Sequence, residues 1–398
     1  MFKFALRNVL RNKRRSFLTV LTIFLAAVLV GLAQGWVNGI MGVYIDNFTK
    51  YQTGHVRITT EEYTKREKFL PVDEIVFDPD RIINDVLGIK GVRTVKERIR
   101  FAILLGNRET TVESVGMGID LQNNEFNLSK RLKTGRVTKS GIYVGNRLAE
   151  KLGVSLGQDL LIATKTSEGG LNGIKLKING IFNFGMMYDK KFFFMGLKDA
   201  KRLLKIYNGT TEIFVFANET TLTDQVKAEI EKILPKDIKA ETYKEQLGDF
   251  YDTLETTKSV YGFIEALILF LASFVIINTM MMAVFERLKE IGTMKALGMT
   301  DRDLFMNFTC EGAILGIVGG VAGATVGFLL ILALAQNGID FSAQIENIEM
   351  PFEYVLRPKL RFTDLSIALG ISIFVPTLAA MIPARYARKL MPAEALRK

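Results

Sequence analysis

The sequence has almost none of the residues on which disulfides, metal centres and nucleophilic catalysis depend. It contains one cysteine, Cys310, and one histidine, His55, in 398 residues. A single cysteine excludes an intrachain disulfide, and because Cys310 is far from the N-terminus we expect no lipid anchor there. One histidine cannot build a multi-histidine metal site, and it leaves Ser-His or Cys-His catalysis with poor prospects. We therefore expect neither a metal site nor a catalytic site.

Nucleotide and nucleic-acid motifs are also missing. No G-x-x-x-x-G-K-[ST] string occurs, so this chain has no P-loop with which to cradle phosphates. The net charge of +10 could suggest a nucleic-acid partner, but no RNP, helix-turn-helix or zinc-finger pattern accompanies it. The basic residues instead lie beside long apolar runs. We expect no nucleic-acid partner, no cofactor and no enzymatic activity of its own.

What the sequence does contain is four apolar runs, each long enough to cross a membrane. A helix needs about 20 apolar residues to span a ~30 Å hydrocarbon core. The runs that meet this length, with their interfacial flanks, are 17–43, 258–285, 308–336 and 365–384. A cleaved signal peptide is the alternative for the first run, but its length and the absence of a clean small-x-small site favour a retained span.

The charges of the short segments predict the orientation of these spans. Residues 1–16 carry basic residues and no acid, and they read as an amphipathic helix on the membrane surface. The segments 286–307 and 385–398 are also basic, and with four spans all three fall on one side. That side is expected to be cytoplasmic, although the outer loop 337–364 also carries basic residues. The long segment 44–257 is then extracytoplasmic.

Segment 44–257 contains no apolar run long enough to span, and strands alternate with helices in it. It predicts an α+β domain with its own core, inserted between the first and second spans. Helical patterns continue beyond Trp36 and before Tyr261, which predicts a short stalk; loose surface helices are the alternative. The elements expected are a hairpin (98–105 and 110–117), a helix (145–153), two strands (158–165 and 174–184) and a helix (220–234).

Glycines recur at every fourth position of the third span. Small residues at this spacing let helix backbones approach closely in lipid. The alternative is that these glycines face lipid without a partner. The two series are Gly312, Gly316 and Gly320, and Gly319, Gly323 and Gly327.

Two acidic residues, Glu265 and Glu311, and a deeper amide, Asn278, fall within the expected spans. An ionisable residue inside a membrane is a functional candidate by default. Glu265 and Glu311 lie near span ends, however, so both can simply reach the interface. Asn278 lies deeper, and we expect it to hydrogen-bond a neighbouring helix rather than to touch a substrate.

The stretch between the second and third spans is the most distinctive. In E-R-L-K-E-I-G-T-M-K-A-L-G, residues 286–298, charged positions alternate with apolar residues at helical spacing. This pattern predicts a short amphipathic helix between two spans, with an apolar face that needs a partner. A plain connecting loop is the alternative.

The string E-R-x-x-E-I-G-x-x-K-A-L-G resembles the cytoplasmic coupling segment of the MacB/FtsX/Lol-type ABC transporter permeases. Four further strings resemble the same family: A-L-R-N-V-L-R-N-K-R-R-S (5–16), V-G-M-G-I-D (115–120), G-N-R-L-A-E-K-L-G-V-S-L-G-Q (145–158) and the basic tail 383–397. The Q-T-G-H at 52–55 is similar to one branch. The resemblance thus covers nearly the whole chain, in family order.

The resemblance implies a permease subunit of the bacterial inner membrane. It would pair with a second permease subunit, identical or different, and bind two copies of a separate cytoplasmic ABC ATPase. Movement of the coupling helix would be carried by the second span to the outer domain. The residues that would dock on the ATPase are Glu286, Arg287, Glu290, Ile291, Gly292, Lys295, Leu297 and Gly298.

Three functions fit this resemblance. Release of lipoproteins toward a periplasmic carrier, as in the Lol-type branch, is favoured by the four spans, the domain size and Q-T-G-H. The Lol permease that recruits the carrier has an extended hairpin where residues 167–173 here form a short turn, which favours its partner permease or another substrate. The alternatives are MacB-type efflux of drugs or peptides from the periplasm and FtsX-like signalling to cell-wall hydrolases.

Overall fold

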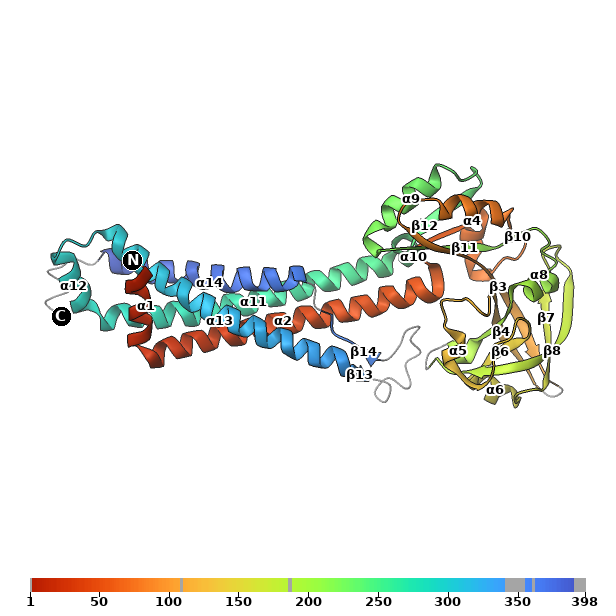
Figure 1. The fold of residues 1–398 in the computed structure, drawn as a ribbon, viewed down its shortest axis with the longest axis horizontal. Coiled ribbons are helices and arrows are strands. Elements are labelled where there is room, and N and C mark those ends of the chain that lie inside the picture. The colour runs from red at the N-terminus through yellow and green to blue at the C-terminus, as the bar shows by residue number, and fades with distance from the viewer. Residues whose placement is uncertain (1, 108–109, 185–187, 341–354, 360–361, 390–398) are drawn as a thin grey trace. The chain divides into compact units, whose positions relative to one another are not determined.

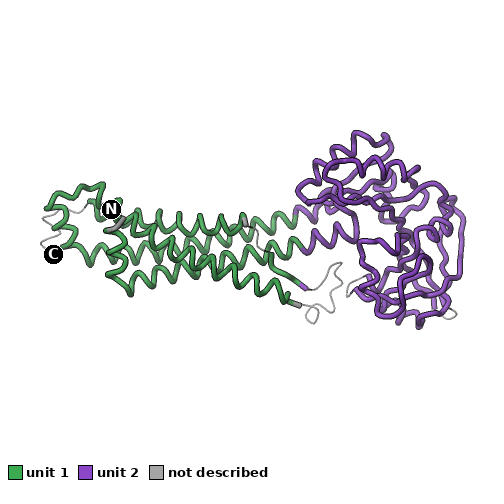
Figure 2. The backbone as a smooth tube through the Cα atoms, in the orientation of Figure 1, with its two compact units in different colours: residues 1–42, 253–339, 356–398 green, residues 43–252, 340–355 purple. Residues whose placement is uncertain are grey.

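The computed structural model describes residues 2–107, 110–184, 188–340, 355–359 and 362–389. The chain forms two compact units (Figures 1 and 2): Met1–Gly42 with Thr253–Ile339 and Leu356–Lys398, and Val43–Asp252 with Asp340–Val355. The hairpin tip at 108–109, most of the expected outer loop 337–364 and the end of the tail 385–398 lie outside the described residues.

The first unit contains the four expected long helices. They are α2 (Lys13–Phe48), α11 (Asp249–Glu286), α13 (Asp301–Asn337) and α14 (Phe362–Lys389). A short helix α1 (Phe2–Arg11) precedes α2, and a short helix α12 (Leu288–Ala296) lies between α11 and α13. All four long helices are apolar and long enough to cross a membrane, as judged by length and composition. Four spans with a domain inserted between the first and second are therefore confirmed.

Helix α13 begins at Asp301, ahead of the expected span at 308. The cause is a capping box at Thr300 and Asp303, which was not predicted from the sequence. The Thr300 hydroxyl accepts a hydrogen bond from the Asp303 amide at 3.2 Å, and the Asp303 carboxylate accepts one from the Thr300 amide at 3.4 Å. Most of the stretch expected to be a loop before residue 308 is thus the first turns of α13.

The two glycine series of the third span face two different helices. A Cβ atom added to Gly320 would lie 2.7 Å from Ser372 Cβ on α14. A Cβ atom added to Gly323 would lie 2.6 Å from the carbonyl oxygen of Phe24 on α2. Gly312 and Gly316 join Gly320 against α14, and Gly319 joins Gly323 against α2. Each series permits a close helix crossing that any larger residue would obstruct.

Replacing Gly320 with Leu is expected to force α13 and α14 apart. Overpacking of this kind costs ~1–3 kcal/mol, so the thermal unfolding temperature of the purified chain in mild detergent should fall. Gly370→Leu on α14 is the matched control, because nothing lies within 4 Å of a Cβ atom built there. Equal unfolding temperatures for the two variants would show that the α13–α14 crossing does not need a glycine.

The second unit is built on a mixed sheet of ten strands. Its strand order is β12-β1-β11-β3-β4-β9-β6-β8-β5, with β7 pairing β3 and β8, and the β4–β9 and β6–β8 pairs are parallel. The strands are β1 (Val56–Thr60), β3 (Val92–Gly106), β4 (Thr111–Ile119), β5 (Leu132–Gly135), β6 (Ile142–Gly145), β7 (Asp159–Lys165), β8 (Leu171–Phe182), β9 (Phe192–Gly196), β11 (Glu212–Ala217) and β12 (Ile238–Thr242). Two-residue strands β2 (Val76–Phe77) and β10 (Gly209–Thr210) pair separately, as do β13 (Ile339–Asp340) and β14 (Val355–Leu356).

Helices cover this sheet and close its cores. The α-helices of the second unit are α3 (Glu61–Arg66), α4 (Pro79–Leu87), α5 (Leu128–Arg131), α6 (Asn146–Leu152), α7 (Tyr188–Lys191), α8 (Leu197–Leu204), α9 (Thr223–Glu231) and α10 (Tyr243–Leu247). Short helical turns are η1 (Thr49–Thr53), η2 (Glu67–Phe69) and η3 (Thr220–Leu222). Residues of α6 and α8 pack on β3, β7 and β9, and residues of α4 and α9 pack on β1 and β11.

The expected hairpin, the β7–β8 pair and the helix that ends at Gly153 are all present. Six strands of this sheet were not foreseen: β1, β5, β6, β9, β11 and β12. Three of them, β6, β9 and β11, are buried along nearly their whole length, so their sequences lack the polar–apolar alternation that identifies a strand. In the stalk, the rings of Tyr44 and Phe250 lie 5.6 Å apart, which brings the extended ends of α2 and α11 together.

Candidate functional site

The segment between α11 and α13 is a short helix with defined ends. At its C-terminus the Gly298 amide donates to the Lys295 carbonyl and the Met299 amide donates to the Met294 carbonyl, both at 3.0 Å. This pair of bonds is a Schellman motif, and it requires the left-handed backbone that Gly298 adopts (φ +97°). The capping box at Thr300 follows directly. The segment is therefore a fixed structural element and not a loose connection.

The two apolar residues expected to contact a partner have opposite surroundings. Ile291 is completely buried, packed in a cluster with Val284, Leu304 and Phe308 of the same chain. Leu297 is 83% exposed. Of the neighbouring glycines, Gly292 is buried and Gly298 is exposed. Ile291 therefore has no surface to offer in this conformation, whereas Leu297 is available for contact.

A buried polar cluster holds the start of α12 in place. Arg287 is almost fully buried, and its Nη1 donates to Glu311 Oε1 at 3.2 Å while its Nε donates to Glu290 Oε2 at 3.1 Å. The Asn8 amide donates to the same Glu311 oxygen at 2.6 Å. Glu311 thus does not reach the interface, as one interpretation of the sequence had it. It joins α1, α12 and α13 through one carboxylate.

Further ion pairs bind α12 to the surrounding helices. Arg11 of α1 donates to Glu290 of α12 at 2.6 Å, and just before α12 an ion pair between Arg15 and Glu286 joins α2 to the end of α11. Burial is the largest single influence and raises the pKa of the Glu290 carboxyl, but the hydrogen bonds and charges of Arg11 and Arg287 together outweigh it and lower this pKa. Exposed pairs such as Arg11–Glu290 each contribute only ~0–1 kcal/mol. The Arg11–Glu290 pair therefore adds little stability, but it links α12 to α1, so that the two helices would move together.

The other end of α12 is held by α13 and α14. Lys295 Nζ donates to the Arg388 carbonyl at 2.7 Å and pairs with Asp301 at 2.8 Å. Ahead of α12, the rings of Phe285 at the end of α11 and Tyr386 of α14 lie 5.4 Å apart in an edge-to-face contact. A force applied to α12 would therefore reach the cytoplasmic ends of α1, α13 and α14 together.

Glu265 and Asn278, the other two span residues singled out from the sequence, lie on α11. The Gln34 amide of α2 donates to Glu265 at 3.1 Å. Asn278 is exposed, and in the described part of the chain it makes no hydrogen bond to a neighbouring helix. In the apolar 18-residue stretch of α11, only 6% of the residues are buried within this chain, against 28–33% for the other three spans. Asn278 thus lies on the span that this chain covers least.

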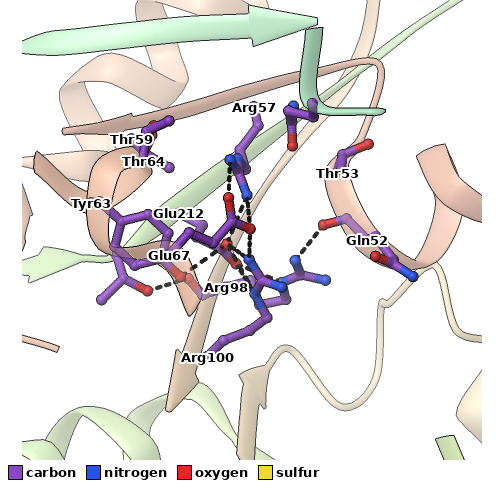
Figure 3. A network of polar contacts seen from close by, with 12 residues as sticks. Gln52, Thr53, Arg57, Thr59, Tyr63, Thr64, Glu67, Arg98, Arg100 and Glu212 are labelled. Atoms are coloured by element: carbon purple, nitrogen blue, oxygen red, sulfur yellow. Dashed lines mark hydrogen bonds and ion pairs between the residues drawn. The ribbon is translucent and has the colours of Figure 1, made fainter. Parts of the chain in front are cut away.

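A second ionic cluster lies in the other unit, where α2 ends in the π-helical turn η1 (Figure 3). Arg98 of β3 donates from Nη1 to the Tyr51 carbonyl at 2.7 Å and from Nη2 to the Gln52 carbonyl at 2.5 Å. Its Nε donates to Glu212 of β11 at 2.8 Å. Carbonyls at a helix C-terminus lack helical partners and attract cations. Arg98 therefore caps the end of α2 and ties it to the sheet.

Glu212 is the centre of this cluster. Arg100 donates to it at 2.6 Å, the Tyr63 hydroxyl donates at 3.1 Å, and Arg57 lies 3.6 Å away. Burial raises the pKa of the Glu212 carboxyl, but the charges of Arg100, Arg98 and Arg57 outweigh burial and lower it to about 2. The group is thus fully ionised at neutral pH. Glu67 and Glu241 complete the charge balance by pairing with Arg57.

Neither cluster was found from the sequence. Arg98 and Arg100 alternate with the apolar Ile99 and Phe101 of β3. This was a usable signal, because arginine is rarely buried without a partner. Their partner Glu212 is 114 positions from Arg98, and Asn8 is 303 positions from Glu311. No local pattern predicts such pairs. Within the described ranges, no group of three or more His, Cys, Asp or Glu residues is placed to hold a metal ion.

Comparisons with known proteins agree with the arrangement described above. Residues 16–233, more than half of the chain, match the MacB-like periplasmic core domain, and residues 262–392 match the FtsX-like permease C-terminal family. The lipoprotein-releasing system transmembrane protein LolC of Xylella fastidiosa strain Temecula1 is 22% identical over 74% of this chain and 75% of its own length. The uncharacterized ABC transporter permease YknZ of Bacillus subtilis strain 168 is 23% identical over 99% of this chain and 98% of its own.

Among solved structures, the periplasmic region of MacB from Actinobacillus actinomycetemcomitans is similar. It has a TM-score of 0.37 and 11% sequence identity, and the match covers 54% of this chain and 97% of that one.

Proposed function

Because the chain belongs to the ABC transporter permease family that combines a MacB-like periplasmic core domain with an FtsX-like permease segment, we propose that it releases lipoproteins from the inner membrane toward a periplasmic carrier. Members of this family work with a cytoplasmic ATPase subunit, and the protein is an inner-membrane protein whose inserted domain lies in the periplasm. The observation that carries the proposal is the similarity to LolC, which extends over three quarters of both chains.

The contacts of α12 support a mechanical role for this subunit. We expect two ATPase copies to act on a pair of permease subunits, each through its own α12. Movement of α12 would pass to α1, α13 and α14 through the cluster around Arg287 and Glu311. It would also pass directly along the chain into α11, which ends at Glu286. The sparse cover on α11 supports the second permease subunit, identical or different, as its neighbour in lipid.

The turn between β7 and β8 bears on the role within a Lol-type pair. It is closed by the Thr166 amide donating to the Gly170 carbonyl at 2.7 Å, so no extended hairpin projects there. This favours the permease that does not recruit the carrier. MacB-type efflux is the second candidate, supported by the match of residues 16–233 to the MacB-like periplasmic core domain.

Reconstitution tests the proposal. The complex is purified from its native membrane with its ATPase, placed in liposomes with a triacylated lipoprotein and supplied with ATP and a soluble periplasmic extract. Lipoprotein should appear in the soluble fraction only with ATP and the extract. Co-purification with a membrane-fusion adaptor, together with no lipoprotein release, would assign the protein to efflux instead. Co-purification with a cell-wall hydrolase would assign it to signalling.

The orientation makes a further prediction that two strongly exposed positions can test. Leu171 is 89% exposed in the periplasmic domain and Leu297 is 83% exposed after α12. In a Cys310→Ser background, an impermeant maleimide should label Leu171→Cys in intact spheroplasts and Leu297→Cys only after lysis. Because both side chains are accessible, the difference reports the side of the membrane. Labelling of Leu297→Cys before lysis would contradict both the orientation and the ATPase contact.

A further inference from the structure

One outward face of the periplasmic sheet is apolar where a strand facing water usually carries polar residues. On β3 the buried Phe101 and Ile103 alternate with Ala102 and Leu104, which face outward, and Leu104 is 46% exposed. On the neighbouring hairpin Leu171 is 89% exposed. Contiguous exposed apolar surface of this kind marks a binding site more often than chance placement does.

This face forms a groove of about 860 Å³, within the ~300–1,000 Å³ typical of sites for small ligands. Its floor follows from the strand register. Leu104 of β3 pairs with Ala163 of β7, which in turn pairs with Gly173 of β8. On the other side Ala102 pairs with Val115 of β4. Leu104 therefore shares one cross-strand row with Ala163 and Gly173, and the small Ala102 lies two residues before it on the same face of β3.

Two polar groups of the lining are already satisfied within the domain. The Thr164 hydroxyl donates to the Ala102 carbonyl at 2.7 Å, at the point where β3 changes partners. The Asn172 amide donates to the Leu203 carbonyl at 2.8 Å. A peptide added as an extra strand would need free backbone groups at this place, and the Ala102 carbonyl is taken. The lining thus offers an apolar trough rather than a strand edge.

The charged residues of the lining are mostly cationic. They are Lys68, Lys165 and Lys191, against the single acid Glu113. None of the three lysines forms an ion pair with another residue of the described ranges. Three unpaired ammonium groups around an apolar trough complement a ligand with a long apolar part and an anionic end.

We propose that this groove binds an acyl chain that ends in an anionic headgroup, with the chain lying over Ala102, Ala163 and Gly173 beside Leu104 and the headgroup among the three lysines. The site belongs to the periplasmic domain alone, and it does not depend on which substrate the transporter moves.

The test uses the full chain in nanodiscs of zwitterionic phosphatidylcholine, without ATPase. A long-chain fatty acid carrying a diazirine in its chain is photolysed with the protein, and the labelled peptides are identified by mass spectrometry. Label is expected on β3 and on the β7–β8 hairpin, and excess unlabelled palmitate should remove it. The corresponding fatty alcohol, which lacks the charge, should label these peptides at least tenfold less.

Two variants separate the trough from its charges. Ala102→Trp fills the floor and should abolish the label, while a Lys68→Gln/Lys165→Gln/Lys191→Gln variant should reduce it at least tenfold. Lys175→Gln is the matched control, since Lys175 lies on the same sheet, outside the lining and paired with Asp159. Lys175→Gln should be labelled like the unaltered chain. All the variants should also unfold at the same temperature as the unaltered chain. Label that is insensitive to Ala102→Trp, equal labelling by the alcohol, or protection of the groove by a second copy of the chain would each overturn the assignment.

Discussion

Replacing Glu212 with Gln is expected to destabilise the periplasmic domain by ~3–5 kcal/mol, the usual cost of removing one partner from a buried ion pair. The side chain of Glu212 is completely buried, and Arg98, Arg100 and Arg57 all lie within ion-pair distance of it. The amide of Gln keeps the shape but loses the charge, so the arginines remain buried with too few anions. Hydrogen–deuterium exchange of β1, β3 and β11 in the full chain measures the loss.

The pH dependence gives an independent measure of the same interaction. The pKa of Glu212 is lowered from its ordinary 4.5 to about 2 in the folded domain. A lowered pKa means that the stabilisation is complete above pH 4.5 and is lost as the pH falls toward 2. A fall from 4.5 to about 2 corresponds to ~3 kcal/mol, at ~1.4 kcal/mol per tenfold change in proton affinity. The Gln variant should lack this part of the acid sensitivity.

Asp159→Asn is the matched control for charge removal in the same domain. Asp159 pairs with Lys175 at 3.3 Å, and both side chains are exposed. Pairs of this kind contribute ~0–1 kcal/mol, so exchange in the sheet should hardly change. If Glu212→Gln behaves like Asp159→Asn, the cluster does not hold the end of α2 to the sheet, and the capping role of Arg98 fails with it.

The features that the sequence predicted are local in the chain, and the features that it did not predict depend on contacts between distant residues. Features set by local spacing were predictable: the four spans from their length, the β3–β4 hairpin from its turn residues, β8 from alternation, and the glycine series from their four-residue repeat. Features that depend on residues far apart in the chain were not. The sequence reading placed Glu311 at an interface because it lies near a span end, whereas Asn8 and Arg287 bury it.

The same division applies within the coupling segment. Helical spacing put Ile291 and Leu297 on one apolar stripe and therefore assigned both to the partner. In the structure α12 bends away from α11 at Arg287, and the stripe is shared between the chain's own core and the outside. Spacing alone predicts that a face will be covered, but it does not predict by what.

Ile291 and Leu297 should therefore give opposite results when each is truncated. Ile291→Ala removes buried atoms from the cluster with Val284, Leu304 and Phe308, and such truncations cost ~2–5 kcal/mol. The purified chain should unfold at a lower temperature. Leu297→Ala removes only exposed atoms, so the thermal unfolding of the isolated chain should stay unchanged.

Binding to the ATPase should show the reverse order of effects. If α12 docks there, Leu297→Ala should weaken ATPase binding by at least tenfold, because a fully buried leucine contributes ~1.5–3 kcal/mol. Co-purification of the ATPase and the ATP hydrolysis of the reconstituted complex give the readout, and Met306→Ala, an exposed apolar residue of α13, is the control. Normal ATPase binding and coupled hydrolysis with Leu297→Ala, in a chain that inserts and unfolds normally, would show that the exposed end of α12 is not the contact. The ATPase would then have to engage the permease elsewhere, and the buried cluster around Glu311 would serve only to hold three helices together.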